Sequence, residues 1–242
     1  MPKDNIKRIC LWSGPRNIST TLMYSFAQRE DTKVFDEPFY AHYLSQSNAK
    51  SYHPGADDIL KSMENDGSKV VDMMIGDHPK QVVFFKNMTH HLLNLDKSFM
   101  RNMHNVILTR DPLEMLPSFA KVIEKPTFED VGYGQHIELV NYMKQQKIDP
   151  IILDSKQILL DPENALIKLC TTIDIPFDSS MLAWQKGMRP EDGVWAKYWY
   201  ATIHNSTGFV PYQPKRGSFP DELQPLLNQC MPCYNQLMEL AK

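Results

Sequence analysis

One stretch near the start of the chain constrains the fold more than any other. Residues 9–12 form a short apolar run that enters a turn at Gly14 and Pro15. Hydroxyl side chains follow at residues 19–21, and apolar residues then recur at helical spacing over residues 22–26. This pattern predicts a buried strand, an anion-binding loop and the N-terminus of a helix.

Composition limits the classes of protein that need to be considered. The chain has 242 residues and is 42% hydrophobic, which is enough for a substantial core, so we predict one domain over residues 1–242. The net charge of -3 and the scattered basic residues leave no long basic stripe of the kind that a nucleic-acid backbone attracts, so we expect no nucleic-acid partner. The absence of a long apolar run argues against a membrane partner, and four dispersed cysteines fit a reducing, cytoplasmic location.

Four further apolar runs predict strands, at residues 34–36, 82–85, 106–109 and 151–153. Three of the predicted strands end in charge: Asp36 and Glu37 after the second, Lys86 after the third and Arg110 after the fourth. Strands that alternate with helices favour an α/β fold, with a central parallel sheet flanked by helices on both faces. The carboxyl ends of such strands are where α/β folds place their sites.

Helix signals separate the strands, with predicted helices at residues 57–63, 135–146, 161–170 and 223–240. Pro117 disturbs the helix that starts after Asp111, so that helix either begins nearer Leu116 or bends. Residues 41–76 carry a weak signal and are interpreted as a lid or substrate-facing insertion. Cys230 and Cys233 are interpreted as an ordinary helix-flanking pair, because they have no second pair or nearby histidine.

The first loop departs from the nucleotide-binding pattern G-x-x-x-x-G-K-[ST]. Ser19 replaces the second glycine and Thr20 replaces the lysine that reaches the outer phosphates in that motif. A small-molecule kinase with an irregular P-loop is therefore the weaker alternative. What remains is a cradle of backbone N–H groups, hydroxyls and the Arg16 charge, which suits a monoanionic tetrahedral group attached to one phosphate.

The same residues resemble the sulfotransferases that use 3'-phosphoadenosine 5'-phosphosulfate (PAPS). Residues 15–20 are similar to the 5'-phosphosulfate loop of that family, although Ile18 stands where glycine is usual and predicts a different local turn. Arg110-Asp111-Pro112 with Ser118 resembles the 3'-phosphate signature. The expected donor-binding residues are Gly14, Pro15, Arg16, Asn17, Ile18, Ser19, Thr20, Thr21, Arg110 and Ser118.

The resemblance implies transfer of a sulfuryl group from PAPS to a hydroxyl or amine of a small-molecule acceptor, leaving 3'-phosphoadenosine 5'-phosphate, with no metal. Lys86 is expected to offset charge on the bridging oxygen, and His90 or Glu37 is expected to take the acceptor's proton. His90 is preferred over its neighbour His91, since only one of two adjacent residues on a helix is expected to face a site. A non-catalytic nucleotide-binding protein of the same fold is the second alternative.

Two late features stay open at this stage. The aromatic cluster Trp195, Tyr198, Trp199 and Tyr200 is either core, which is the commoner outcome, or the wall of an acceptor or adenine pocket. Lys215-Arg216-Gly217 resembles a basic loop that closes over the 3'-phosphate in some sulfotransferases, and an exposed basic loop is an equal interpretation.

Overall fold

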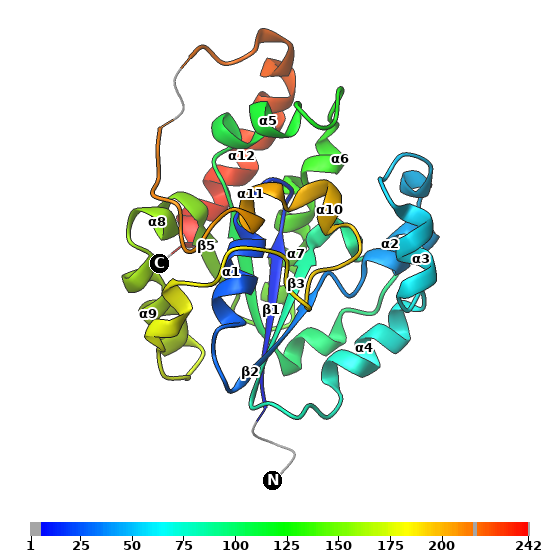
Figure 1. Cartoon of the computed structure of the whole chain (residues 1–242). Helices are drawn as coiled ribbons and strands as arrows, with labels where there is room; N and C mark the ends of the chain where they lie inside the picture. The colour runs from blue at the N-terminus through cyan, green and yellow to red at the C-terminus, as the bar shows by residue number, and fades with distance from the viewer. Residues whose placement is uncertain (1–5, 215–216, 242) are drawn as a thin grey trace.

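A parallel sheet forms the centre of the fold (Figure 1). In the part of the chain that the computed structural model describes, residues 6–214 and 217–241, five strands pair in the order β2-β3-β1-β4-β5, and every pairing is parallel. The strands are β1 (Lys7–Ser13), β2 (Thr32–Asp36), β3 (Val82–Met88), β4 (His104–Thr109) and β5 (Ile151–Asp154). All five predicted strands are thus confirmed.

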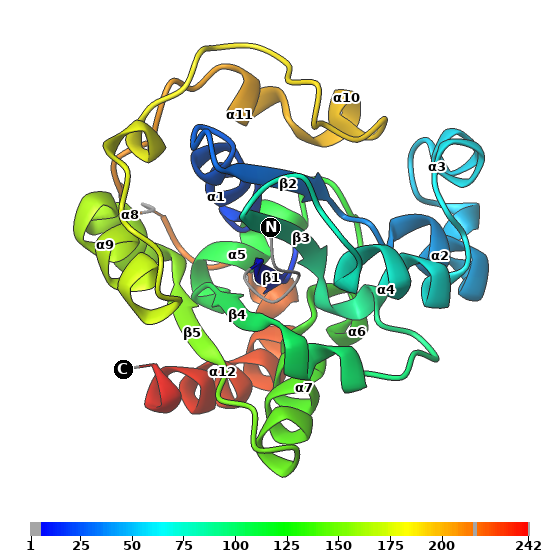
Figure 2. The same ribbon diagram turned by 90° about the horizontal axis from the view of Figure 1, so that it is seen from below.

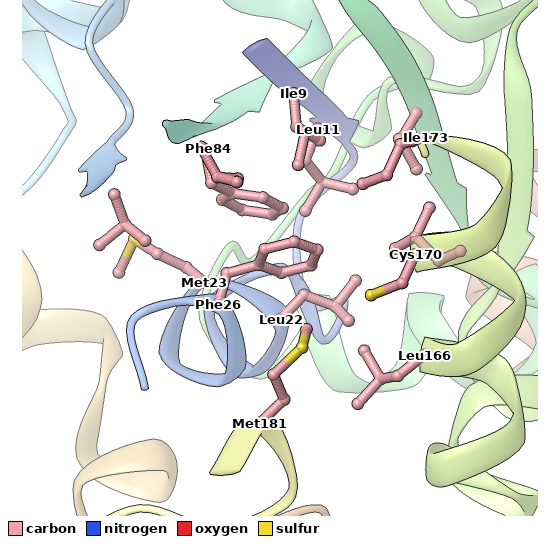
Figure 3. Packing of buried hydrophobic residues seen from close by; sticks show 14 of the residues in the cluster. Ile9, Leu11, Leu22, Met23, Phe26, Phe84, Leu166, Cys170, Ile173 and Met181 are labelled. Atoms are coloured by element: carbon pink, nitrogen blue, oxygen red, sulfur yellow. The ribbon is translucent and has the colours of Figure 1, made fainter. Parts of the chain in front are cut away.

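Strand β1 lies in the middle of the sheet and is buried on both faces. Ile9 and Leu11 pack into one hydrophobic core, and Cys10 and Trp12 pack into the other, so successive side chains serve opposite layers. Figure 3 shows the first core, which holds Ile9 and Leu11 of β1 and the stacked rings of Phe26 and Phe84, with centroids 4.4 Å apart. A near-continuous apolar run is what a parallel strand covered on both faces requires.

Helices cover both faces of the sheet, as predicted. Figure 2 shows α1 and α9 on one side of the sheet and α7 and α12 on the other. The helices are α1 (Ser19–Phe26), α2 (Tyr40–Gln46), α3 (Ala56–Ser62), α4 (Gly67–Ile75), α5 (Pro112–Phe119), α6 (Phe128–Val131), α7 (Tyr133–Gln145), α8 (Ser155–Leu160), α9 (Pro162–Thr172), α10 (Ala196–Trp199), α11 (Ala201–His204) and α12 (Gln224–Leu240). Short 3-10 helices span Asn48–Ser51, Thr89–His91, Ser98–Asn102, Ser179–Leu182 and Asp221–Leu223.

The helix predicted at 57–63 is α3, but the weak signal of residues 41–76 concealed α2 and α4. A start of α5 near Leu116 is wrong, because α5 begins at Pro112 and continues through Pro117. The Asp111 carboxylate accepts the Leu113 N–H at 2.9 Å and caps the helix at its true start. Pro117 removes the N–H partner of the Leu113 carbonyl, and Leu113 is exposed to water.

A late segment, residues 184–213 (the strap), carries α10 and α11 and lies beside α1 and the end of β2 (Figures 1 and 2). Its first residues pair with the segment after α11, since Trp184 N–H donates to the Thr207 carbonyl at 3.1 Å and Gly187 N–H to the His204 carbonyl at 2.9 Å. Asp192 anchors its middle by accepting a 2.8 Å hydrogen bond from Tyr24 of α1. The strap is therefore fastened to the body of the fold. None of the helices in the described residues is long and apolar enough to span a membrane.

Candidate functional site

A cavity of about 460 Å³ lies at the carboxyl ends of the central strands. Every residue expected to bind the donor or act in catalysis lines it: the loop from Gly14 to Thr21, Glu37, Lys86, His90, Arg110 and Ser118. The topology explains the convergence, because parallel strands deliver their carboxyl ends to one edge of the sheet. The predicted site requires these residues to line one cavity, and they do. The role of each residue stays a prediction.

The loop between β1 and α1 has a defined internal structure. Asn17 fixes it by donating from Nδ2 to the Leu108 carbonyl at 3.0 Å and accepting the Ile18 N–H at 2.9 Å. Helix α1 starts without a side-chain cap, so its first N–H groups are available to an anion. Gly14 packs tightly, since a Cβ there would approach the Val131 carbonyl oxygen to 2.8 Å.

The unusual turn of this loop falls at Arg16 rather than Ile18. Arg16 has φ of 52°, in the left-handed region that few non-glycine residues occupy. Ile18 has φ of -92° and ψ of 24°, which an ordinary L residue adopts. Position 18 therefore does not require glycine in this chain. The strained backbone conformation falls on Arg16, a residue that is expected to contact the donor.

Two arginines and a serine meet at one end of the cavity. Arg110 Nη1 donates to the Arg16 carbonyl at 3.0 Å, and Arg16 Nε donates to Ser118 Oγ at 3.3 Å. Burial, together with the neighbouring Arg110 charge, lowers the pKa of Arg16. Arg110 also pairs with Glu114 at 3.3 Å, while its buried Nε has no hydrogen-bond partner. Two close cations that repel each other form a strong anion site.

Lys86 is the centre of a buried polar cluster. Its Nζ donates to Asp36 at 2.8 Å, to Glu37 at 2.6 Å and to the Tyr200 hydroxyl at 2.5 Å. Burial alone would lower the pKa of Lys86, but the carboxylates of Asp36 and Glu37 outweigh it and raise that pKa well above its usual value. An ammonium group has three N–H donors, and all three are used within the protein.

Asp36 organises the cluster and ties it to the strap. Its carboxylate accepts the Tyr200 hydroxyl at 2.8 Å and the Gly193 N–H at 3.1 Å, in addition to Lys86. Asp36 therefore joins the end of β2 to Lys86 and to the strap. Tyr200 reaches it from 164 residues further along the chain.

Glu37 faces the cavity from a strained backbone position. Its φ is 43°, and its backbone N–H donates to the Lys86 carbonyl at 2.8 Å. Burial raises the pKa of Glu37; Lys86 acts in the opposite direction, and Asp36 adds to the increase. Its second carboxylate oxygen lies 4.0 Å from His91 Nδ1. A strained, buried carboxylate with a raised pKa has the properties of a general base.

His90 and His91 both line the cavity, which corrects the expectation that only one of them faces the site. They lie in the 3-10 helix Thr89–His91, whose tighter turn does not separate neighbours as an α-helix does. His91 stacks between Tyr40 and Tyr43, with ring centroids 4.8 Å and 4.7 Å away. Burial and the nearby His53 lower the pKa of His90 to about 4. Both imidazoles are therefore neutral at physiological pH, since burial also lowers the pKa of His91.

The late aromatic cluster divides between core and cavity wall. Trp195, Trp199 and Tyr200 line the cavity, whereas Tyr198 is 47% exposed and lies outside it. Trp195 and Tyr200 are also buried in a core with α2 and α3, so the two interpretations apply to the same residues. Aromatic side chains often serve both purposes at a pocket wall.

Several lining residues were missed by sequence reasoning. Tyr40, Tyr43, His53 and Asp130 join the cavity from α2, the following turn and α6. The dense Tyr and His content of residues 40–53 was the one available signal. Lys215 and Arg216 lie outside the described residues. Cys230 and Cys233 lie within α12 rather than flanking it, do not line the cavity, and have pKa values raised by burial.

The residues present fit a phosphosulfate group. The arginine pair, the uncapped N-terminus of α1 and the unpartnered Arg110 Nε supply donors at one end of the cavity. No group of three or more His, Cys, Asp or Glu in the described residues is placed to hold a metal ion. The chemistry at this end is that of a cationic, hydrogen-bonding anion site.

Solved structures share the fold at low sequence identity. The sulfotransferase domain from the curacin biosynthetic pathway aligns with a TM-score of 0.54 at 14% identity, over 93% of this chain and 98% of that one. The sulfotransferase domain of the Synechococcus PCC 7002 olefin synthase aligns with 0.57 at 11% identity, over 93% and 95%. A sulfotransferase from Alicyclobacillus acidocaldarius gives 0.54 at 11%, over 97% and 95%. These likenesses show the architecture.

Sequence relatives are more similar but longer. The chain is 43% identical to branched-chain-amino-acid aminotransferase-like protein 2 of Arabidopsis thaliana and 40% identical to protein 1 of that name. These matches cover 93% and 96% of this chain but only 40% and 41% of the relatives, so the chain spans about two fifths of their length. The family described as "Sulfotransferase domain" matches residues 7–241. With that match over nearly its whole length, the chain belongs to the sulfotransferase domain family.

Proposed function

We propose that this protein transfers a sulfuryl group from PAPS to a hydroxyl or amine of a small-molecule acceptor. One observation carries the proposal: the arginine pair and the Lys86–Glu37 cluster line the same cavity. A transferase needs an anion site for its donor and a proton acceptor within one enclosed space, because positioning is the main source of rate enhancement. Family membership supports the sulfuryl chemistry.

In this proposal the two arginines hold the donor. Arg16 with Ser19 and Thr20 binds the transferring group and its 5'-phosphate, and Arg110 with Ser118 binds the 3'-phosphate. The acceptor oxygen forms a bond to sulfur while the bond from sulfur to the bridging phosphate oxygen breaks. The acceptor's proton passes to a base in the cavity, and 3'-phosphoadenosine 5'-phosphate leaves with the bridging oxygen.

The hydrogen bonds of Lys86 argue against the expected contact between its ammonium group and the bridging oxygen. Because its three N–H donors already bind Asp36, Glu37 and Tyr200, it has none to spare for the bridging oxygen in this arrangement. We propose that Lys86 holds the Glu37 carboxylate in place and keeps it ionised, and that it reaches the bridging oxygen only by releasing one of these bonds.

Glu37 is the better candidate for the base. A general base works best when its pKa is near the working pH. Burial raises the pKa of Glu37, which makes its carboxylate a stronger base, whereas burial lowers the pKa of His90 to about 4. The neutral His90 is better suited to hydrogen-bonding the acceptor than to removing its proton.

Calorimetry with 3'-phosphoadenosine 5'-phosphate tests the donor site. We expect micromolar binding in the wild type, at least tenfold weaker binding in Arg110→Ala, and wild-type binding in Arg101→Ala, an exposed arginine outside the cavity. Binding of ATP in preference to 3'-phosphoadenosine 5'-phosphate would refute the proposal and favour the kinase alternative.

A second experiment assigns the base. Sulfuryl transfer from PAPS to a metabolite pool, followed by mass spectrometry, identifies an acceptor. We then expect Glu37→Gln to lower kcat at least a hundredfold while 3'-phosphoadenosine 5'-phosphate still binds, because general bases contribute factors of about 10² to 10⁴. His90→Asn should retain most of the activity. The reverse pattern would assign the base to His90.

A further inference from the structure

The cavity is divided by charge. Arg16 and Arg110 make its donor end positive, with Glu114 partly balancing Arg110. Among the described lining residues the other cation is Lys86, and it is paired with two carboxylates at 2.8 Å and 2.6 Å. The end of the cavity around Glu37 therefore has one ammonium group against the carboxylates of Asp36 and Glu37.

Asp130 adds a further negative charge to this second end. It lines the cavity from α6, and its carboxylate is held by the Thr127 N–H at 2.8 Å and the Thr127 hydroxyl at 2.9 Å. It lies close enough to His53 and His90 to act against the burial that lowers their pKa values. The histidines remain neutral, so nothing among the described lining residues compensates Asp130.

The wall of this end is aromatic and held in place by its own contacts. Tyr40 and Tyr43 enclose His91, and the Tyr40 hydroxyl hydrogen-bonds His53 Nδ1 at 2.7 Å. Trp195 meets Tyr40 edge to face with centroids 5.0 Å apart. Aromatic rings around carboxylates attract organic cations by their quadrupoles as well as by charge, and a fixed wall loses little entropy on binding.

We propose that the acceptor is a small cationic alcohol, whose hydroxyl is placed at Glu37 and whose ammonium group lies among the aromatic rings near Asp130. This inference rests on the proposed function. A carboxylate or phosphate on the acceptor would be repelled by Glu37 and Asp130, and no unpaired cation among the described lining residues at this end would offset the repulsion. An ammonium group is attracted by both carboxylates. The donor and the acceptor then carry opposite charges, which places each at its own end of one cavity.

Calorimetry on the complex with 3'-phosphoadenosine 5'-phosphate tests this with two probes of the same shape. Choline carries a quaternary ammonium group, and 3,3-dimethylbutan-1-ol replaces its nitrogen by carbon. We expect choline to bind at least tenfold more tightly, and the difference to shrink as salt is raised, because salt screens charge. Equal binding, preference for the neutral alcohol, or no detectable binding of either probe overturns the inference.

A matched pair of variants locates the effect. Asp130→Asn should reduce the preference for choline at least threefold while leaving the binding of 3'-phosphoadenosine 5'-phosphate unchanged. Glu129→Gln removes a neighbouring carboxylate on the same helix that does not line the cavity, and it should keep the full preference. The two failures are distinguishable: loss of nucleotide binding in the wild type refutes the proposed function, whereas nucleotide binding without a choline preference refutes only the acceptor class.

Discussion

Replacing Asp36 by asparagine should destabilise the fold and shift the pH dependence of activity in a direction that the structure fixes. Asp36 and Lys86 have side chains that are 1% and 2% exposed, so their pairing is screened very little by water. Removing one partner of a buried pair costs about 3–5 kcal/mol, because the other charge is left buried. Lys86 keeps Glu37, so we expect the lower end, about 3 kcal/mol off the free energy of unfolding.

The matched control is Asp174→Asn. Asp174 pairs with Lys7 at the same 2.8 Å, but its side chain is 92% exposed, so water screens the pair and it contributes little to stability. Urea unfolding followed by tryptophan fluorescence measures both variants. The reasoning is refuted when Asp36→Asn loses no more stability than Asp174→Asn.

The kinetic consequence of Asp36→Asn concerns Glu37. The Asp36 charge raises the pKa of Glu37, so its removal lowers that pKa. A base with a lower pKa stays ionised in more acidic solution, and the acid limb of the kcat/KM profile should therefore move to lower pH. A shift to higher pH would show that Glu37 is not the titrating base.

Two further predictions concern the region behind the donor loop. Gly14→Ala should lower the free energy of unfolding by about 1–3 kcal/mol, because the added Cβ would lie 2.8 Å from the Val131 carbonyl oxygen. Unchanged urea unfolding would show that the loop and α6 can separate freely. His136 is buried with no hydrogen-bond partner on either ring nitrogen, and burial lowers its pKa to about 3. In the unfolded chain this histidine takes up a proton near pH 6.5. Between pH 7 and pH 5 the free energy of unfolding of the wild type should therefore fall by about 2 kcal/mol more than that of His136→Phe. Equal falls in urea titrations would contradict this.

The sheet and the donor end of the cavity were predictable because their signals are local. Each apolar run was long enough to identify a strand, and the charged residue after the run lines the cavity, as for Lys86 and Arg110. The expected strand end at Lys86 is wrong, because β3 continues to Met88. The loop from Gly14 to Thr21 lies between a strand and a helix, so its sequence fixes its place in the fold.

The acceptor end of the cavity could not be predicted in the same way. The bond between Tyr200 and Asp36 joins residues 164 positions apart, and nothing in either local sequence specifies the other. Helix α2 was missed because its apolar and aromatic side chains pack against α3 and the strap rather than along one simple face. The role of Lys86 changed for a related reason, since its hydrogen-bond donors are satisfied by residues from β2 and from the strap.

The anchoring of the strap has an evolutionary consequence. The strap contributes Trp195, Trp199 and Tyr200 to the cavity wall, while Arg16, Arg110 and Ser118 come from other segments of the chain. The strap is attached at a few points, among them Gly193 to Asp36 and Asp192 to Tyr24. Exchange of this one segment between homologues, with these attachments retained, is thus a route by which the choice of acceptor can diversify while the machinery for the donor is inherited intact.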